Sequence, residues 1–311
     1  MSRSDELVRS IRQAPVVHLL RAGSTGSAGP IGSVVVVHPG ALPAKVHATL
    51  AAALPDEVGV LVLDLQGLPE YAGAAMAGGA VGDASVTTIA DRLVTELHAA
   101  LPADHPYVLV GWSFGGVVAH QMTCSPALFR APERLVLLDS ISAGEGYSAT
   151  VESLGDEVAL TWFEMYLGAK RPRPDAVREP RPPQTLTEVL ERGLRAGTLR
   201  PGTSIDGLRK AYSVFVDGLR RNTFLSNPHH PARSHVPTSV IRAEGSLLAE
   251  LGTLGYADLV PPRVELHTVP GDHYSMLDDP IAVAVVSSIC SRYLEIPTGA
   301  GPHGVNLERL P

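Results

Sequence analysis

The sequence predicts an α/β fold in which a mostly parallel central sheet has helices on both faces and carries a helical insertion. Apolar runs of strand length alternate with segments of helical periodicity over most of the 311 residues. The strand runs are continuously apolar, which is typical of parallel sheets buried on both faces. The alternation stops between about residues 140 and 235, where helical segments follow one another. With 45% hydrophobic residues, the chain can bury the core of one large domain.

The predicted strands are short apolar runs bounded by turn residues. The run at 58–66 (VGVLVLDLQ) is the clearest, since it is apolar at nearly every position over a length that suits a buried strand. The segment GSTGSAGP is rich in turn residues and separates the first two strands. In chain order, the predicted strands are 16–22, 33–38, 58–66, 107–111, 134–139, 236–243 and 264–269.

Amphipathic segments between these strands predict helices. In residues 85–101, Ile89, Leu93 and Leu97 recur at helical spacing on one face, and Ser85 is a typical N-cap. The other predicted core helices are 42–54, 114–124 and 281–294.

The organisation that follows is a core interrupted by one insertion. The insertion has helical patches at 154–167, 186–194 and 205–225, and we expect it to form a lid over the carboxyl end of the sheet. The small-residue-rich segment at 70–86 is expected to be a flexible loop near the site. The predicted parts are an N-terminal extension at 1–32, a core at 33–140 and 234–296, a helical lid at 141–233 and a disordered tail at 297–311.

Composition excludes several classes of protein. The net charge of −7 argues against a nucleic-acid partner, because such proteins normally carry a basic balance. No apolar run reaches the ~18–20 residues that cross a bilayer, and the start, MSRSDELVRSIRQAP, lacks the apolar stretch of a secretion signal. The two cysteines, Cys124 and Cys290, fit no metal spacing and no disulfide framework. We therefore expect a cytoplasmic protein.

The segment Gly111-Trp112-Ser113-Phe114-Gly115 has the G-x-S-x-G pattern of a nucleophile elbow. It lies between an apolar strand and a predicted helix, which is the context that the pattern requires. A sharp turn there lifts the serine hydroxyl above the sheet, and the adjoining strand and helix leave no room for a side chain at either glycine. The N-terminus of the following helix would stabilise negative charge beside the serine. The alternative is an inert serine in a tight strand–helix turn.

A serine hydroxyl needs a general base to act as a nucleophile. His273, in VPGDHYSMLDDP, is the predicted base, because it follows the last strand, where this kind of site places its histidine. His267 lies within a predicted strand and His303 in the predicted tail. Three further histidines stand at the end of the predicted lid: His229, His230 and His235.

The predicted acid is Asp139, which ends the strand after the elbow at the carboxyl edge of the sheet. The other common location is after the following strand, where Glu244 stands in IRAEGS, with Asp258 further along. Asp272, beside His273, is expected to shape its loop.

Acyl transfer also needs two backbone N–H groups that stabilise the oxyanion. Phe114, the residue after the serine, would supply one. Ala41 or Gly40, in the loop that follows an early core strand, would supply the other. His38, which begins that loop, is expected to shape it rather than act as a base.

These segments together resemble the thioesterase domains of polyketide synthases and nonribosomal peptide synthetases, which have the α/β-hydrolase fold. The resemblance rests on VVVVHPGAL, GWSFGGVVAHQM, RLVLLDS and GDHYSMLDDP, which occur in the family's order over about residues 33–280. The placement of Asp139 resembles the chain-terminating domains of assembly lines. Stand-alone editing thioesterases tend to carry the acid one strand later and a PYAGG-like early loop, where this chain has HPGAL. The resemblance therefore favours product release over editing.

The resemblance implies that Ser113 attacks a carrier-bound acyl thioester while His273 takes its proton and Asp139 holds the imidazole. Water would release the acyl-serine as a free acid, and an internal nucleophile would release it as a macrocycle. The phosphopantetheine arm belongs to the acyl or peptidyl carrier protein, so the enzyme itself needs no cofactor and no metal. We expect either a separate protein or an excised terminal domain, and pairing through the polar first helix would make it a homodimer.

The predicted lid differs in charge from the rest of the chain. From Lys170 to Arg233 there are 13 Lys/Arg against 6 Asp/Glu, a local net charge of +7 in a chain of −7. This surface is either a solvated arginine-rich face or a landing site for an acidic carrier protein.

Two competing functions remain. A general carboxylesterase or lipase of the same fold would share every catalytic residue, so only substrate preference separates it from a thioesterase. A non-enzymatic relative that serves as a binding module usually lacks one triad member, whereas this chain has all three.

Overall fold

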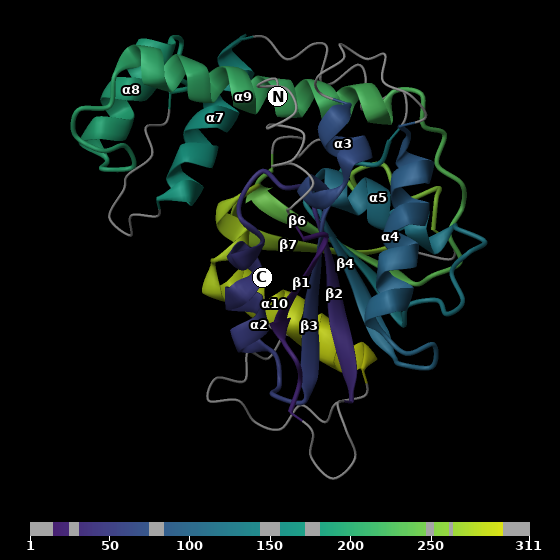
Figure 1. Cartoon of the computed structure of the whole chain (residues 1–311). Helices are drawn as coiled ribbons and strands as arrows, with labels where there is room; N and C mark the ends of the chain where they lie inside the picture. The colour runs from purple at the N-terminus through teal and green to yellow at the C-terminus, as the bar shows by residue number, and fades with distance from the viewer. Residues whose placement is uncertain are drawn as a thin grey trace, which may run out of the picture.

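The computed structural model describes residues 15–24, 31–74, 84–143, 156–171, 181–246, 252–260 and 264–294. Its centre is a seven-stranded sheet in the order β1-β3-β2-β4-β5-β6-β7 (Figure 1). β1 (Val17–Arg21) is antiparallel to β3 (Val58–Asp64), and all other neighbouring strands are parallel. The prediction of a mostly parallel sheet in an α/β fold is confirmed.

The central strands are buried along their whole length. β2 (Gly32–His38), β4 (Tyr107–Trp112) and β5 (Arg134–Leu138) are buried at every position, which explains their continuously apolar sequences. Gly111 in β4 is level with Val37 in β2 and Leu137 in β5. These three strands therefore end together, and the loops that leave them meet at one edge of the sheet.

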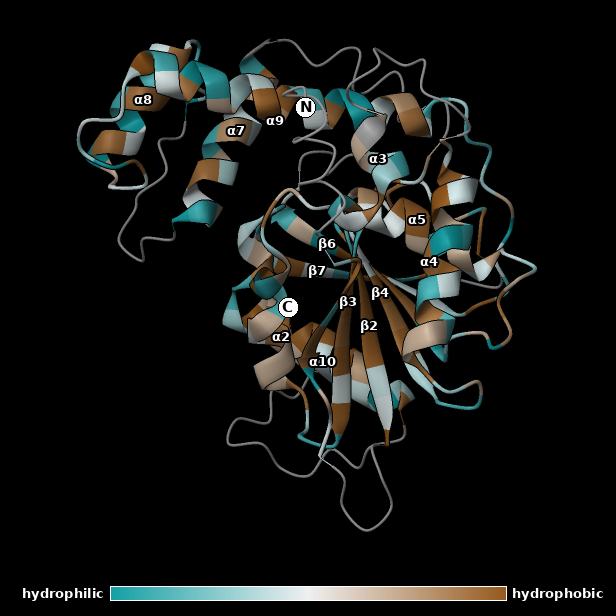
Figure 2. Ribbon diagram, viewed as in Figure 1, coloured by the Kyte–Doolittle hydropathy of each residue, from teal (hydrophilic) through white to brown (hydrophobic). Residues whose placement is uncertain are grey.

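Helices cover both faces of the sheet. α4 (Val86–Ala100) and α5 (Phe114–Thr123) pack on one face, against Val35 and Val37, while α2 (Ala48–Ala53) and α10 (Pro280–Tyr293) pack on the other, against Val34 and Val36. Alternate residues of one strand thus belong to two separate cores. Figure 2 shows the central strands as mostly hydrophobic ribbons between the helices. The last two strands are β6 (Thr238–Gly245) and β7 (Glu265–Asp272).

Short helical turns lie in the loops around the carboxyl edge. They are η1 (Ala44–His47), η2 (Leu65–Gly67), α3 (Pro69–Gly73) and η4 (Ser275–Leu277). η1 replaces the first part of the helix predicted at 42–54. The first part of the loop predicted at 70–86 is the helix α3, which begins with Pro69 at a position where a missing N–H costs nothing. Residues 75–83 lie outside the described part.

In the described part of the chain between β5 and β6, three helices lie above the carboxyl edge of the sheet in Figure 1: α7 (Asp156–Lys170), α8 (Leu186–Arg195) and α9 (Ile205–Ser226). They agree with the helical patches predicted for the insertion. Phe163 of α7 and Phe215 of α9 pack with their rings 5.4 Å apart, which ties the two helices together.

The ends of the chain are described only in part. β1 lies within the predicted N-terminal extension at 1–32 and is an edge strand of the same sheet. The predicted tail at 297–311, with His303, lies outside the described residues. In the ranges that are described, no helix combines the length and the apolar composition that crossing a bilayer requires.

Candidate active site

Ser113 occupies a strained turn between β4 and α5. Its backbone has φ 55° and ψ −132°, a conformation that a residue with a side chain rarely adopts. Its N–H donates to the carbonyl of Leu138 at 3.0 Å, which fixes the turn to the end of the neighbouring strand. The side chain remains partly exposed.

Glycines make this turn possible. A Cβ at Gly111 would overlap Gly116, and one at Gly115 would overlap the Val37 carbonyl, so the strand and helix leave no room, as the sequence predicts. A Cβ at Gly116 would overlap the hydroxyl of Ser140. The five-residue pattern does not include this third glycine.

Three predicted side chains meet beside this turn. His273 Nε2 lies 2.9 Å from Ser113 Oγ, and His273 Nδ1 lies 2.8 Å from Asp139 Oδ2. The residues come from loops after β4, β5 and β7, which end at the same edge of the sheet. Because Asp139 at Nδ1 accepts a hydrogen bond, it leaves Nε2 free to accept the serine proton.

Asp139 is held by its own backbone and by the next strand. Its φ is 42°, its N–H donates to the Ile241 carbonyl at 2.8 Å, and its second carboxylate oxygen accepts from the Ala243 N–H at 3.2 Å. The residue is 3% exposed. The alternative acids Glu244 and Asp258 are exposed residues, and it is Asp139 that the structure pairs with His273.

The loop after β7 presents the histidine. Asp272 Oδ1 accepts from the N–H groups of Tyr274 and Ser275 at 3.0 and 2.9 Å, so this carboxylate shapes the loop, as expected. The other histidines lie elsewhere: His267 is in β7, His229 is buried next to exposed His230, and His235 is exposed.

Trp112 anchors the same loop from the elbow. Its indole N–H donates to the backbone carbonyl of His273 at 3.0 Å, and it is completely buried. Its ring also contacts the rings of His273 and Tyr274, at centroid distances of 5.4 and 5.7 Å. The sequence pattern treats this position as variable, so it carries no signal for this role.

The predicted oxyanion residues line the same pocket as Ser113. Phe114 is the first residue of α5, where backbone N–H groups have no partner within the helix. Gly40 and Ala41 lie in the loop after β2, where Gly40 has φ 79° and packs so closely on Gln66 that a Cβ would overlap it.

His38 supports this loop, as the sequence predicts. Its Nε2–H donates to the Leu42 carbonyl at 2.7 Å, so its Nδ1 accepts from His47 Nε2, 3.0 Å away. Burial lowers the pKa of both rings, which keeps them neutral and preserves this pattern. The His38 ring also stacks on Trp112 at 5.5 Å.

Tyr71 links α9 to the loop after β2, residues 39–41, which holds the predicted oxyanion residues and which we call the oxyanion loop. Its hydroxyl lies 3.0 Å from the Pro39 carbonyl and 2.8 Å from Asn222 Oδ1, and it accepts from Arg221 Nη2 at 3.0 Å. Its ring stacks on Phe114 at 5.8 Å and under the Arg221 guanidinium at 3.9 Å. Burial raises the pKa of Tyr71, and Arg221 opposes this rise. No sequence pattern indicates a role for Tyr71, because it lies in a segment that is predicted to be a loop.

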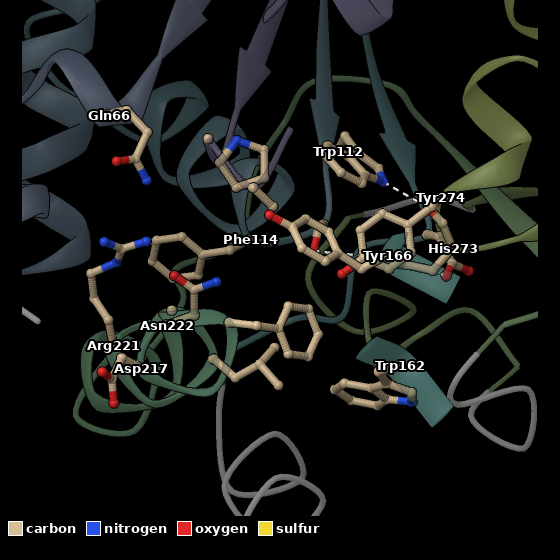
Figure 3. A pocket seen from close by; sticks show the side chains of 18 of the residues that line it. Gln66, Trp112, Phe114, Trp162, Tyr166, Asp217, Arg221, Asn222, His273 and Tyr274 are labelled. Carbon is tan, nitrogen blue, oxygen red and sulfur yellow. Dashed lines mark hydrogen bonds and ion pairs between the residues drawn. The ribbon is translucent and has the colours of Figure 1, made fainter. Parts of the chain in front are cut away.

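A pocket of about 350 Å³ opens over these groups. Figure 3 shows Trp162, Tyr166 and Tyr274 on the side of His273, and Gln66, Asp217, Arg221 and Asn222 on the opposite side of the view. The α9 residues could not be assigned from the sequence, because their helical spacing does not show which face meets the sheet. Among the described residues, no group of three or more His, Cys, Asp or Glu side chains is arranged to hold a metal ion.

Comparison with known proteins agrees with this architecture. The model of the alpha/beta hydrolase family matches residues 34–286, and the chain belongs to that family. No curated protein sequence gives a match.

Solved structures with the same fold include thioesterase domains. The NocB thioesterase domain, in covalent complex with a fluorophosphonate nocardicin G analogue, is 24% identical with a TM-score of 0.52, covering 90% of this chain and 99% of that one. The RedJ thioesterase from the prodiginine pathway of Streptomyces coelicolor is 16% identical with a TM-score of 0.50, covering 90% and 95%. Holo-AB3403, a four-domain nonribosomal peptide synthetase, is 19% identical with a TM-score of 0.62 over 94% of this chain. The chain spans 21% of that protein's length. At these identities the comparison establishes the fold.

Proposed function

We propose that this α/β hydrolase is a serine thioesterase that releases a polyketide or peptide acyl chain from a phosphopantetheine carrier protein. The observation that carries the proposal is the continuous hydrogen-bonded series Ser113–His273–Asp139, whose members all line one pocket. The resemblance of the motifs to assembly-line thioesterases, and the fold shared with the thioesterase domains NocB and RedJ, support this substrate class.

In the acylation step, His273 Nε2 takes the proton of Ser113 as Oγ attacks the thioester carbonyl carbon. The backbone N–H of Phe114 and that of Ala41 or Gly40 stabilise the oxyanion. The intermediate then collapses, the carbon–sulfur bond breaks, and the imidazolium returns its proton to the departing thiolate. Asp139 holds the ring and stabilises its charge throughout.

In the release step, His273 removes a proton from the acceptor as it attacks the acyl-serine ester, and returns the proton to Ser113 Oγ. Water as acceptor gives a free acid, and a hydroxyl or amine of the acyl chain gives a macrocycle. The helices α7 and α9, which supply the pocket's outer wall, would act as the lid that decides between the two by admitting or excluding water.

The basic surface of this lid is the proposed docking site for an acidic carrier protein. Several arginines pair with carboxylates nearby in sequence, such as Arg209 with Asp206 and Arg220 with Asp217, but the segment keeps an excess of positive charge. Exposed pairs of this kind contribute little to stability. The net positive charge of the segment gives the surface a positive electrostatic potential.

Intact-mass measurement after incubation with carrier-bound acyl thioesters tests the proposal. We expect an acyl adduct on the wild-type protein, no adduct on Ser113→Ala, and a released acid or macrocycle in the supernatant. A thioester that is turned over at the wild-type rate by Ser113→Ala would refute it. A strong preference for simple oxygen esters over thioesters would instead identify a carboxylesterase.

The docking site is tested separately by charge reversal. Arg200→Glu with Lys210→Glu, both at exposed positions, should raise KM for a carrier-bound substrate and leave KM for a small soluble thioester unchanged. An equal change for both substrates would refute docking at this surface.

A further inference from the structure

One side of the pocket is rich in hydrogen-bond donors. The donors on this side are Gln66, Arg221 and Asn222, which we call the donor patch. Figure 3 shows them, with Asp217, across the view from Trp162 and His273. Nothing in the proposed acylation and release steps uses these side chains, so they need another explanation.

The donor patch is a built arrangement that spans three segments of the chain. Gln66 packs on Gly40 of the oxyanion loop, while Arg221 and Asn222 of α9 both contact the Tyr71 hydroxyl. Tyr71 in turn contacts the Pro39 carbonyl, next to Gly40. The patch is therefore held in place on both sides by the loop that also supplies an oxyanion donor.

Its donors exceed the acceptors that the described residues provide. Arg221 uses Nη2 for Tyr71, but its Nε is buried and has no hydrogen-bond partner among the described residues. A buried donor on a charged group is costly unless an acceptor reaches it. Asn222 meets Tyr71 through its oxygen, so its amide nitrogen, like the Gln66 side chain, has no partner in the described part of the chain.

The charge of Arg221 is also uncompensated locally. Asp217 lines the same side, but its side chain is 54% exposed and lies 3.6 Å from Arg220, whose side chain is 77% exposed. Arg221 itself has its guanidinium over the Tyr71 ring and no ion pair among the described residues. A ligand that brings an oxygen acceptor would pair with the amide nitrogens of Gln66 and Asn222 and offset the charge of Arg221.

We propose that the donor patch binds a carbonyl or carboxylate oxygen of the acyl chain, so that the substrate is an oxygenated acyl group rather than a plain alkyl chain. This inference rests on the proposed thioesterase function and specifies its substrate class. Apolar parts of the same chain would lie against the aromatic side, where Tyr166 and Phe215 pack together at 5.1 Å.

The experiment compares matched soluble thioesters of N-acetylcysteamine: an octanoyl chain, and chains of equal length that bear a ketone or a terminal carboxylate. For the wild type we expect kcat/KM to favour an oxygenated chain by roughly tenfold to a hundredfold, which is the range for a hydrogen bond to a charged group. Arg221→Met should abolish this preference. Arg220→Met, one residue away and not part of the pocket lining, should retain it.

The same acyl groups as p-nitrophenyl esters separate two sources of oxygen. These esters lack any part of the pantetheine arm, so a preference that persists with them assigns the bound oxygen to the acyl chain. A preference seen only with the thioesters would show that the acyl oxygen is not recognised without the arm, and would overturn the inference.

Two further outcomes would also overturn it: no preference in the wild type, or an equal fall for all substrates in Arg221→Met, which would mean that Arg221 acts only through Tyr71. Thermal midpoints of both variants show whether they fold. Acyl adducts on Ser113 from every thioester, without any preference, would support the thioesterase function and refute only the proposed role of the donor patch. No adduct from any thioester would remove the function itself.

Discussion

The indole N–H of Trp112 donates a hydrogen bond to the backbone carbonyl of His273, 3.0 Å away. Adjacent residues of the elbow thereby hold the proposed base in two ways, through the Ser113 hydroxyl and through the Trp112 side chain. Because proton transfer requires a short and well-aligned contact, this second attachment would position the imidazole for the proposed reaction.

Trp112→Phe should lower kcat by about fivefold and change KM little. The substitution keeps an aromatic ring against His38 and Tyr274 but removes the donor, and losing one buried hydrogen bond costs about 1 kcal/mol. Steady-state kinetics with a soluble thioester measure the effect. Trp162→Phe is the control, because Trp162 lines the pocket wall and should affect KM more than kcat. An unchanged kcat in Trp112→Phe would show that the loop needs no such anchor.

Asp139→Asn should lower turnover by about 10⁴, as loss of the orienting acid does in serine-protease triads. The amide cannot accept from His273 Nδ1–H without reorienting, and it removes the charge that stabilises the imidazolium. Glu244→Gln is the matched control and should retain near-wild-type turnover, since Glu244 is exposed at the end of β6. The reverse result, with a mild effect at 139 and a severe one at 244, would move the acid to the next strand.

The sequence predicted the sheet because each central strand is apolar at nearly every position. Such a strand is stable where both faces of the sheet are covered, as in a parallel sheet between two layers of helices. It also predicted that Ser113, Asp139 and His273 lie at one edge of the sheet, because each follows a parallel strand and the carboxyl ends of parallel strands meet at that edge. The prediction that their side chains contact one another rested on this topology. In the structure they are joined by two hydrogen bonds.

The rest of the site depends on contacts between distant residues that carry no local pattern. Tyr71 and Asn222 are 151 positions apart, and Trp112 and His273 are 161 apart. No spacing or local composition in the sequence indicates either of these two contacts. Likewise, α9 is amphipathic, but only the packed structure shows that Arg221 meets the pocket while Arg220 faces solvent.

Gly116→Ala should destabilise the fold by about 1–3 kcal/mol, the range for inserting a methyl group into a packed site. Its Cβ would overlap the hydroxyl of Ser140, which is completely buried and 3.1 Å from the Tyr256 hydroxyl. Urea denaturation gives the free energy of unfolding.

Gly168→Ala is the matched control for that measurement. Gly168 is also helical, in α7, but an added Cβ would meet no atom within 4 Å, so alanine should leave stability unchanged or raise it by up to about 1 kcal/mol. Adding Ser140→Gly to Gly116→Ala should recover part of the loss. Equal stability of the two single alanine variants would show that α5 can shift away from β5 without cost.

Buried His120 should make the protein less stable in acid. Burial lowers its pKa from 6.5 to about 4, and neighbouring His229 adds to this effect. Above pH ~6.5 the ring is neutral in both states, so it contributes no pH dependence. As the pH falls below 6.5 the unfolded chain binds a proton that the folded chain does not, so stability declines until the pH reaches the folded pKa. The loss by pH ~4.5 is about 2–3 kcal/mol.

The measurement is the free energy of unfolding between pH 7.5 and 4.5 for the wild type and His120→Gln. The variant should be less stable at neutral pH, because the substitution disturbs the packing around a side chain that is only 1% exposed. Its stability should nevertheless decline less steeply as the pH falls. His230→Gln, at an exposed neighbouring site, should keep the wild-type slope. Parallel curves for the wild type and His120→Gln would mean that His120 takes up its proton equally in both states, and the acid sensitivity would then have to arise from other groups.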